Sequence, residues 1–282
     1  MIGTTFRAMG TDVAIVTADD PATEATRELF QRVEARCSRF REDSELTAIN
    51  MAAGDHVELS PFMEKLLAIA AELRDRTGGL VDAGLGGAVA AWGYDRTFEE
   101  VVDRDTAPTA LLDHPNWHLD GHTLIREPSV AMDLGGIAKG WTCDRAVEQG
   151  LAVMVSAGGD VRSADSDTQV EIMDPWDGIA AVVPLGVGAL ATSSITRRRW
   201  QVGETAAHHL IDPRTLAPAV TPVLSASVVA PTAVEAEAGA KAVLLQGADG
   251  LAWAATQPWI EGALVVWQDG SVYATTGMEI AA

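Results

Sequence analysis

The chain has 282 residues, of which 48% are hydrophobic and 21% are charged, so it can form one large domain or two small ones around a sizeable core. Its 40 acidic side chains against 20 basic ones give a formal net charge of −20. This balance argues against binding to nucleic acid or to an anionic membrane surface, because such binding needs a basic face that attracts phosphate.

Cysteine usage and the N-terminal residues favour a reducing compartment. Cys37 and Cys143 form no C-x-x-C pair, so we expect two half-buried free thiols rather than a zinc knuckle or a redox dithiol. The opening residues, MIGTTFRAMGTDV, lack the regions of a signal peptide and a lipid-attachment cysteine. No apolar run is long enough to span a bilayer. The sequence therefore predicts a cytoplasmic protein without a membrane span.

Hydrophobic periodicity and turn residues predict the elements of the first half of the chain. Ser60-Pro61 is a strong helix start, because serine caps a helix and proline suits its first turn. In chain order we expect a strand at 11–17, a helix from Pro21 to about Phe40, a short helix or turn at 44–50, a helix from Pro61 to Gly78-Gly79, a small-residue-rich stretch at 80–95, a loop and a helix at 96–112, and a hairpin at 117–126.

The second half mixes strands and helices without strict βαβ alternation. We expect a turn and helix at 132–150, a strand at 153–161, strands at 170–173 and 180–184, a strand at 188–195, a short strand at 208–211, a strand at 223–230, a helix from Pro231-Thr232 to about Leu245, and a hairpin of 263–267 and 272–275. This order predicts an α+β fold, in which no internal repeat is visible.

The stretch MDLGGIAKGWTCDRAVEQG (132–150) and its sequel VMVSAGGDV (153–161) carry the clearest chemical signal. Glycines at the mouth of a helix let a ligand approach the backbone, and the free N–H groups there suit an anion. Lys139 adds positive charge between the flanking carboxylates Asp133 and Asp160. A plain tight turn is the alternative interpretation of the glycines.

Two further stretches carry groups suited to a phosphate-containing substrate. Arg197, Arg198 and Arg199 follow directly after TSSI in an acidic protein, and arginine is a natural partner of phosphate. A solvated charge run is the alternative. In HHLIDPRT (208–215) a histidine beside an aspartate and a hydroxyl suits general-base work near neutral pH, although a structural histidine is the alternative.

Eight stretches, in the same order, resemble the ApbE-type flavin transferases, the FAD:protein FMN transferases. They are AMGTDVAI, CSRFREDSELTAIN, GGLVDAGLGGAVAAWGYD, MDLGGIAKGWTCDRA, SAGGDVR, LATSS with its arginines, HHLIDPRT and SVVAPTAVEAEA. DLGGIAKG followed by AGGD is the most specific pair. The resemblance implies a T-fold-related α+β architecture, a single ApbE-like domain over 1–282, and two subdomains around an FAD cleft.

The resemblance also implies an activity. It is the Mg²⁺-assisted transfer of FMN from FAD to a threonine or serine of an acceptor protein, with release of AMP. FAD and that acceptor are then the expected partners. Two alternatives stay open, namely an FAD pyrophosphatase that gives FMN and AMP, and an FAD-binding protein without transfer activity.

Site residues are implied by motif position. They are Met9, Asp82, Asp133 and Lys139 as FAD contacts, Asp160 and Ser193 as further contacts, Leu210 or Ile211 lining the isoalloxazine or adenine pocket, His209 as the general base for the acceptor, and a metal held between the carbonyl of Gly136 and side chains of the helix that starts at Thr232.

That helix departs from the family pattern, Glu-Ala-Asp-x-x-x-Thr, whose aspartate and threonine are metal ligands. Glu237 replaces the aspartate and can still ligate Mg²⁺, but Lys241 replaces the threonine, and an ammonium group has only donors. A need for Mg²⁺ is therefore in doubt. Ser194 and Leu216 also stand where the family has glycine.

Three interpretations of Lys241 stay open. It stands in for the metal charge and touches the pyrophosphate, which would place it among the catalytic residues. It pairs with Glu237 at i, i+4 and leaves FAD bound but poorly cleaved. Or it is an exposed surface lysine on a helix whose register differs from the expected one.

Overall fold

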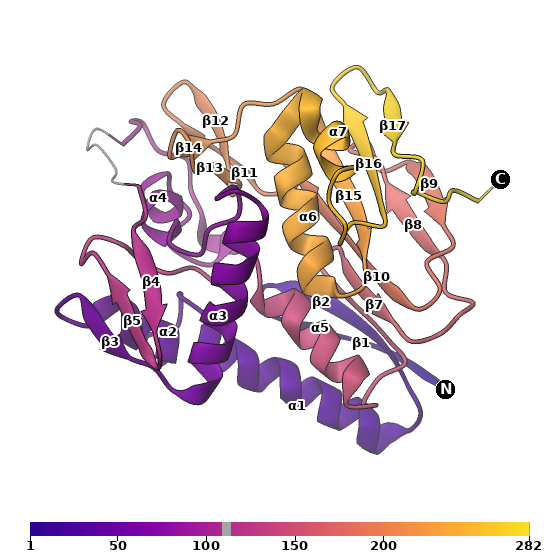
Figure 1. Cartoon of the computed structure of the whole chain (residues 1–282), viewed down its shortest axis with the longest axis horizontal. Coiled ribbons are helices and arrows are strands. Elements are labelled where there is room, and N and C mark those ends of the chain that lie inside the picture. Colours follow the sequence, from indigo (N-terminus) through magenta and orange to yellow (C-terminus); the bar gives the residue numbers. More distant parts are fainter. Residues whose placement is uncertain (109–113, 282) are drawn as a thin grey trace. The chain divides into compact units, whose positions relative to one another are not determined.

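A computed structural model describes residues 1–108 and 114–281 of the chain. The chain forms two compact units, which can be followed by their colours in Figure 1. Unit 1 comprises 1–34, 137–196 and 221–282, and unit 2 comprises 35–136 and 197–220. Both units mix helices with antiparallel strands, so the predicted α+β class is confirmed.

Unit 1 is built on an antiparallel sheet of eight strands in the order β1-β2-β6-β7-β10-β15-β16-β17. The strands are β1 (Ile2–Ala8), β2 (Thr11–Thr17), β6 (Met154–Ala157), β7 (Asp160–Ser163), β10 (Gly188–Ser194), β15 (Val223–Ala230), β16 (Gly262–Trp267) and β17 (Val272–Ala274). A separate hairpin is formed by β8 (Val170–Met173) and β9 (Ile179–Val183).

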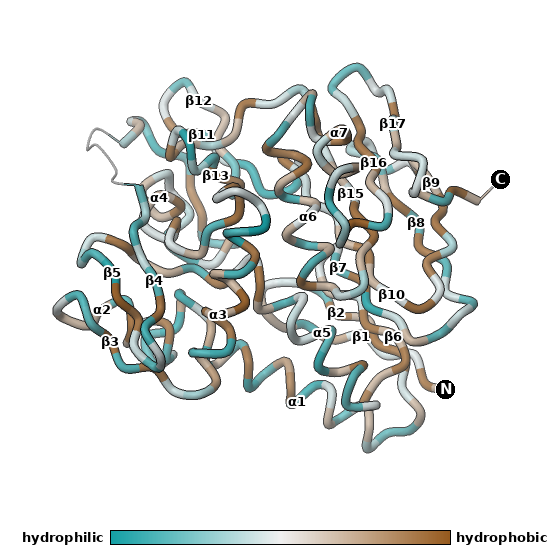
Figure 2. Tube along the Cα trace, viewed as in Figure 1, coloured by the Kyte–Doolittle hydropathy of each residue, from teal (hydrophilic) through white to brown (hydrophobic). Residues whose placement is uncertain are grey.

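Successive side chains of a strand point to opposite faces of the sheet. In the central strands both faces are buried, since each is covered by other elements of unit 1. On one face Leu190 and Leu264 join a core cluster with Ile172 of the β8–β9 hairpin. On the other, α6 (Ala233–Gln246) packs against β10 and β15, and its neighbour α5 (Ala138–Glu148) packs against α6 (Figure 1). Figure 2 shows hydrophobic residues along β8 and these central strands. The remaining helices of unit 1 are the first part of α1 (Asp20–Cys37), η2 (Gly247–Asp249) and α7 (Gly250–Ala254).

Unit 2 has short elements around an aromatic core. Its helices are α2 (Glu45–Met51), α3 (Pro61–Arg76), α4 (Gly86–Ala91) and the 3₁₀ turn η1 (Phe98–Glu100). Its strands are β3 (His56–Glu58), β4 (Trp117–Asp120) and β5 (Thr123–Arg126) in one sheet, β11 (Arg199–Val202) with β12 (Thr205–His208), and β13 (Ile211–Asp212) with β14 (Ala217–Pro218). Trp200, Val202 and Ala207 are buried together with Trp92 and Tyr94 packed on them.

Several predicted elements agree with the structure. Ser60 caps α3 by accepting a hydrogen bond from the N–H of Met63, and Pro61 is its first residue, as predicted. The strand at 11–17, the short helix after Ser44, the strands at 170–173 and 223–230, and the hairpins at 117–126 and 263–275 are also present.

Two stretches predicted as strands are more complex in the structure. In 153–161 the expected strand is β6, the Gly-Gly turn follows at Gly158 and Gly159 with φ +61° and +103°, and a second strand, β7, which was not predicted, begins at Asp160. A Cβ on Gly158 would lie 2.7 Å from the Thr11 hydroxyl oxygen, so the turn needs glycine for space as well as for backbone conformation. The strand expected at 208–211 is also interrupted, because His208 ends β12 and Ile211 begins β13.

Other elements were not predicted or have different bounds. Strand β1 precedes the expected first strand, and α1 ends at Cys37 rather than near Phe40. Both cysteines are buried, not half-buried. The polar stretch 96–112 holds only η1 in its described part, and 109–113 lie outside the described residues. Within the part of the chain that is described, no helix is long and apolar enough to cross a membrane.

Candidate functional site

Helix α6 has its start fixed by two side chains. Thr232 accepts a hydrogen bond from the N–H of Glu235 at 3.3 Å, which confirms the predicted cap. The Asp144 carboxylate of α5 accepts hydrogen bonds from the N–H groups of Ala233 (2.8 Å) and Val234 (3.1 Å). Three of the four N–H groups that a helix start leaves without partners are therefore satisfied. The register of α6, and with it the position of Lys241, follows from these contacts.

Gly140 explains why the glycine of the AKG run is needed. A Cβ at this position would lie 2.9 Å from the backbone atoms of Ala233 and Val234, so only glycine lets α5 approach the start of α6 so closely. Lys139, one residue earlier, therefore lies close to α6, where its ammonium group donates to Glu237.

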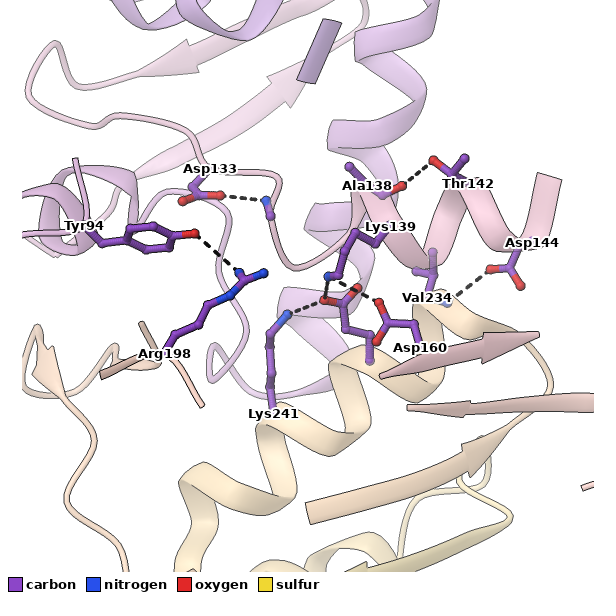
Figure 3. Close-up of polar contacts among 12 residues, drawn as sticks. Tyr94, Asp133, Ala138, Lys139, Thr142, Asp144, Asp160, Arg198, Val234 and Lys241 are labelled. Atoms are coloured by element: carbon purple, nitrogen blue, oxygen red, sulfur yellow. Dashed lines mark hydrogen bonds and ion pairs between the residues drawn. The ribbon is translucent and has the colours of Figure 1, made fainter. Parts of the chain in front are cut away.

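Four of the predicted site residues meet in unit 1. Lys139 Nζ lies 2.9 Å from Oε1 of Glu237 and 3.3 Å from Oδ2 of Asp160, which opens β7. Lys241 Nζ donates to the same Oε1 of Glu237 at 2.9 Å. Figure 3 shows both ammonium groups pointing at one carboxylate, with Asp160 beside Lys139. We call Lys139, Asp160, Glu237 and Lys241 the lysine–carboxylate cluster.

Burial makes the charges of this cluster interact strongly. The side chains of Asp160 and Glu237 are 4% and 5% exposed, and those of Lys139 and Lys241 are 14% and 16% exposed. The third interpretation of Lys241, an exposed surface lysine, is therefore wrong. The pairing with Glu237 is present, as its i, i+4 spacing predicts.

The two carboxyl groups of the cluster respond in opposite ways. Burial, joined by the negative charge of Glu237, raises the pKa of Asp160. Burial also disfavours the ionised form of Glu237, but the adjacent Lys139 and Lys241 outweigh it and hold the pKa of Glu237 well below its usual value. Glu237 is thus the group that stays ionised, and its single negative charge is shared between the two lysines.

The cluster does not fit the divalent cation that the resemblance implies. Oε1 of Glu237 already accepts both ammonium groups, so a cation on that oxygen would face two positive charges at short range. Its Oε2 is buried without a hydrogen-bond partner among the described residues, but it is one oxygen where Mg²⁺ requires several. No group of three His, Cys, Asp or Glu side chains able to hold a metal occurs in the described ranges.

Asp133 and the glycine turn form a second site, in unit 2. Oδ1 of Asp133 accepts a hydrogen bond from the N–H of Gly135 at 2.6 Å, and Oδ2 pairs with Nε of Arg39 at 2.7 Å. The Arg39 guanidinium also lies over the rings of Phe40 (4.2 Å) and Tyr94 (4.8 Å). Gly136, whose carbonyl is the predicted metal ligand, follows directly in the chain.

Arg39 and Asn50 are missed by reasoning from the sequence. Asn50 holds the residue before Asp133 from both sides, since its side chain donates to the carbonyl of Met132 (2.9 Å) and accepts from its N–H (2.7 Å). Both residues lie in CSRFREDSELTAIN, a stretch that the resemblance includes but from which no site residue was taken. Their polarity inside a helix-forming stretch was the available signal.

Asp82 is held in place in unit 2. Its Oδ1 accepts hydrogen bonds from the N–H of Gly84 and from Nε1 of Trp117, both at 2.7 Å. A small-residue stretch follows it, and a Cβ at Gly84 would collide with Pro115 and Trp117. Asp82 therefore has hydrogen-bond partners within unit 2, in addition to the FAD contact predicted for it.

The two adjacent histidines have different surroundings. His208 is buried, its Nε2 lies 3.0 Å from the carbonyl of Ala219, and its Nδ1 accepts the N–H of Leu210. Burial lowers the pKa of His208, so it is a neutral structural histidine. His209 is half-buried. The nearby Asp212 carboxylate is bonded to the side chain and the N–H of Arg214.

The remaining predicted residues divide between the units. Leu210 and Ile211 are buried in unit 2, where Ile211 joins a core cluster with Leu85 and Leu216. Ser193 is buried in β10 of unit 1, opposite Ala226. Met9 is half-buried in the β1–β2 turn.

The departures from glycine, and the turn at Met9, have structural consequences. Met9 and Leu216 adopt φ +51° and +55°, a region that favours glycine. Ser194 bonds to the carbonyl of Leu224 at 3.1 Å and lies 2.8 Å from the Thr196 hydroxyl. Of the three arginines, Arg199 opens β11 and Arg198 donates to the Tyr94 hydroxyl at 3.4 Å, so this run is not a simple solvated loop.

The comparisons with known proteins all indicate the same family. The model of the ApbE family matches residues 9–264. A protein of Rhodobacter capsulatus named FAD:protein FMN transferase is 31% identical over 98% of this chain, and the chain spans 57% of that relative's length. A protein of Treponema pallidum with the same name is 32% identical over 80% of the chain, which covers 71% of that relative.

Solved structures agree in fold. The ApbE protein of Thermotoga maritima superposes with a TM-score of 0.83 at 25% identity, covering 98% of this chain and 97% of that one. The flavin transferase ApbE of Vibrio cholerae gives a TM-score of 0.80 at 24% identity over the same shares. Because the family model matches most of the chain and two relatives exceed 30% identity, this protein belongs to the ApbE family.

Proposed function

We propose that this protein is an FAD:protein FMN transferase, which moves FMN from FAD to a threonine or serine of an acceptor protein and releases AMP. The observation that carries the proposal is the family match over residues 9–264, together with the name shared by the Rhodobacter and Treponema relatives. Under this proposal the whole chain acts as a single functional domain.

The reaction breaks the phosphoanhydride bond of FAD and forms a phosphoester bond to the acceptor. The acceptor hydroxyl oxygen bonds to the phosphorus on the riboflavin side of FAD, and the bond from that phosphorus to the bridging oxygen breaks. AMP leaves with the bridging oxygen, and the hydroxyl proton passes to a base. Phosphoryl transfer of this kind depends mainly on positioning and on neutralising the phosphate oxygens.

Side chains for these roles are available in the chain. Lys139 has the charge to hold a phosphate oxygen, and Asp133, Asp82, Met9, Asp160 and Ser193 are the proposed further contacts to FAD. His209 is the proposed base, because its neighbour His208 is buried with both ring nitrogens engaged. Leu210 and Ile211 are proposed to flank the ring system of FAD. Gly136 and Glu237 are the positions where the resemblance would place Mg²⁺.

The alternatives differ in their products. The protein is incubated with FAD alone, and with FAD plus an acceptor protein modified by one of the named relatives. AMP and FMN are then measured by chromatography and the acceptor mass by mass spectrometry. A transferase gives a flavin-labelled acceptor and AMP. Free FMN without an acceptor would identify an FAD pyrophosphatase, and intact FAD in both mixtures would identify a binding protein.

A matched pair of variants tests His209 as the base. H209A should lose acceptor labelling while keeping FAD binding, since a general base contributes about 10²- to 10⁴-fold to rate. H118A, which removes an exposed histidine of β4, is the control and should label at the wild-type rate. Equal labelling by both variants would remove His209 from the mechanism.

A further inference from the structure

Two of the three lysines of this chain contact the same oxygen atom. The sequence contains Lys65, Lys139 and Lys241, among 20 basic and 40 acidic residues. Lys65 is exposed on α3, whereas Lys139 and Lys241 both lie 2.9 Å from Oε1 of Glu237. A lysine ammonium is a compact charge and is seldom buried. Because the chain has few lysines, the meeting of two of them at one buried carboxylate points to a specific role.

The convergence is held by the fold and not by flexible side chains alone. Lys241 lies two turns after the start of α6, and that start is bonded to Thr232 and to Asp144. Lys139 lies beside Gly140, where α5 approaches α6 too closely for any other residue. Each ammonium group therefore reaches Glu237 from a rigid helix, and the two helices are locked together.

The charges of the cluster favour an anion and disfavour a cation. Glu237 is shared between two lysines, so this one carboxylate faces two positive charges, while Asp160 pairs with Lys139 and burial raises its pKa, which disfavours its negative charge. The Lys241 ammonium has three N–H donors, one of which bonds to Glu237, and the others can serve a ligand. The side chains of Lys139 and Lys241 are 14% and 16% exposed, so an anion can reach them.

We propose that Lys139 and Lys241 together hold the diphosphate of the substrate and take the place of a divalent cation, so that this protein binds its dinucleotide without Mg²⁺. The identity of the dinucleotide, FAD, rests on the proposed function. The lysine site itself would bind any diphosphate. The chemical class of ligand is a diphosphate ester or inorganic pyrophosphate.

The test measures the affinity of the full chain for FAD and for inorganic pyrophosphate, in EDTA and in Mg²⁺. Wild-type protein should bind both ligands equally well in the two conditions. K241T replaces an ammonium by a hydroxyl that can ligate a cation, and it should lose about tenfold or more in EDTA, the value of one charge-assisted hydrogen bond. Adding Mg²⁺ should restore much of that loss in K241T alone.

Matched variants separate a local effect from unfolding. K241R keeps the positive charge, so it should bind in EDTA more tightly than K241T and gain nothing from Mg²⁺. K65T removes the exposed lysine and should behave as wild type in both conditions. Thermal unfolding of each variant, measured in parallel, shows that the proteins compared are folded.

The outcomes keep this inference apart from the proposed function. Stronger FAD or pyrophosphate binding by the wild type in Mg²⁺ than in EDTA would overturn the inference and leave the transferase proposal standing. K241T binding as tightly as wild type in EDTA would also overturn it. Metal-free binding of pyrophosphate that K241T weakens, without any binding of FAD, would support the lysine site and overturn the proposed function.

Discussion

The two units neutralise their acidic side chains in different ways. In unit 1, Glu237 and Asp160 are almost fully buried and are paired with lysines that keep only a small accessible part. In unit 2, the Asp133 side chain is 20% exposed and is bonded to one arginine and one backbone N–H, with aromatic rings on the arginine face. Buried lysine pairs concentrate charge, whereas the arginine pair of unit 2 spreads it over a planar group against aromatic rings.

The difference indicates separate tasks for the two sites. A compact buried charge is most effective where a small, highly charged group such as a diphosphate must be held. A planar guanidinium stacked on Phe40 and Tyr94 is suited to positioning Asp133 beside the glycine turn. The following predictions test this contrast, from the largest expected effect to the smallest.

Removing the shared carboxylate should cost more stability than removing its counterpart in unit 2. E237Q removes the carboxylate that Lys139 and Lys241 share and leaves only Asp160, beside Lys139, as a counter-charge, and breaking a buried ion pair in this way costs about 3–5 kcal/mol. D133N keeps a side-chain oxygen that can accept from the Gly135 N–H or from Arg39, whose guanidinium also lies over Phe40, so its cost should be nearer about 1 kcal/mol. Urea unfolding of both variants measures the difference, and equal free energies of unfolding would contradict it.

The start of α6 should make stability depend on pH. Burial, opposed by the N–H groups of Ala233 and Val234, raises the pKa of Asp144 from 3.8 to about 6. Since the folded-state pKa is raised, the contribution of Asp144 to stability is fully present below pH 3.8 and is lost as the pH rises through about 6. The shift corresponds to about 3 kcal/mol.

D144N provides the reference for that titration, because asparagine does not ionise. The free energy of unfolding of the wild type minus that of D144N should fall as the pH rises from 3.8 to about 6 and then level off. A difference that stays constant over this range would show that Asp144 does not titrate with a raised pKa.

Leu216 of unit 2 and Met9 of unit 1 share a backbone conformation with positive φ. We expect substitutions at the two positions to change stability in opposite directions. Leu216 is buried against Leu85 and Ile211, so L216G relieves strain of about 1 kcal/mol but removes a core side chain worth about 2–5 kcal/mol. We expect a net loss of about 2 kcal/mol, the smaller of these terms subtracted from the larger. A rise in melting temperature for L216G would show that strain outweighs packing there.

Met9 is expected to behave differently because it is half-buried in a two-residue turn. M9N creates the Asn-Gly pair that such turns prefer, and it should raise stability by about 0.5–1 kcal/mol. If Met9 contacts FAD as proposed, the same variant should bind FAD more weakly. Thermal unfolding and FAD titration check the two halves, and unchanged values in both would leave Met9 with neither strain nor a binding role.

Motifs with local signals were predictable from the sequence. The caps of α3 and α6 were, because a serine or threonine next to a proline specifies a helix start within a few residues. So was the i, i+4 pairing of Glu237 with Lys241. The ordered motifs also identified the family, because each short run carries its own residue pattern.

Long-range contacts were not predictable in this way. The return of the chain as β7 after the Gly-Gly turn depends on pairing with β6 and β10, and the role of Arg39 depends on its meeting Asp133, far along the chain. Motif position selects His209 over His208 as the expected base, but only the structure shows that His208 is buried with both ring nitrogens engaged.

By itself the sequence determined the family, the helix starts and the presence of a lysine where an oxygen ligand was expected. Only the tertiary structure decided what that lysine does, because charge interactions depend on distance and burial and not on spacing along the chain. Lys139 and Glu237 are remote in sequence, yet the close packing of α5 on α6 brings a second ammonium to the same carboxylate oxygen. The anion site that we propose in place of a cation site rests on that packing.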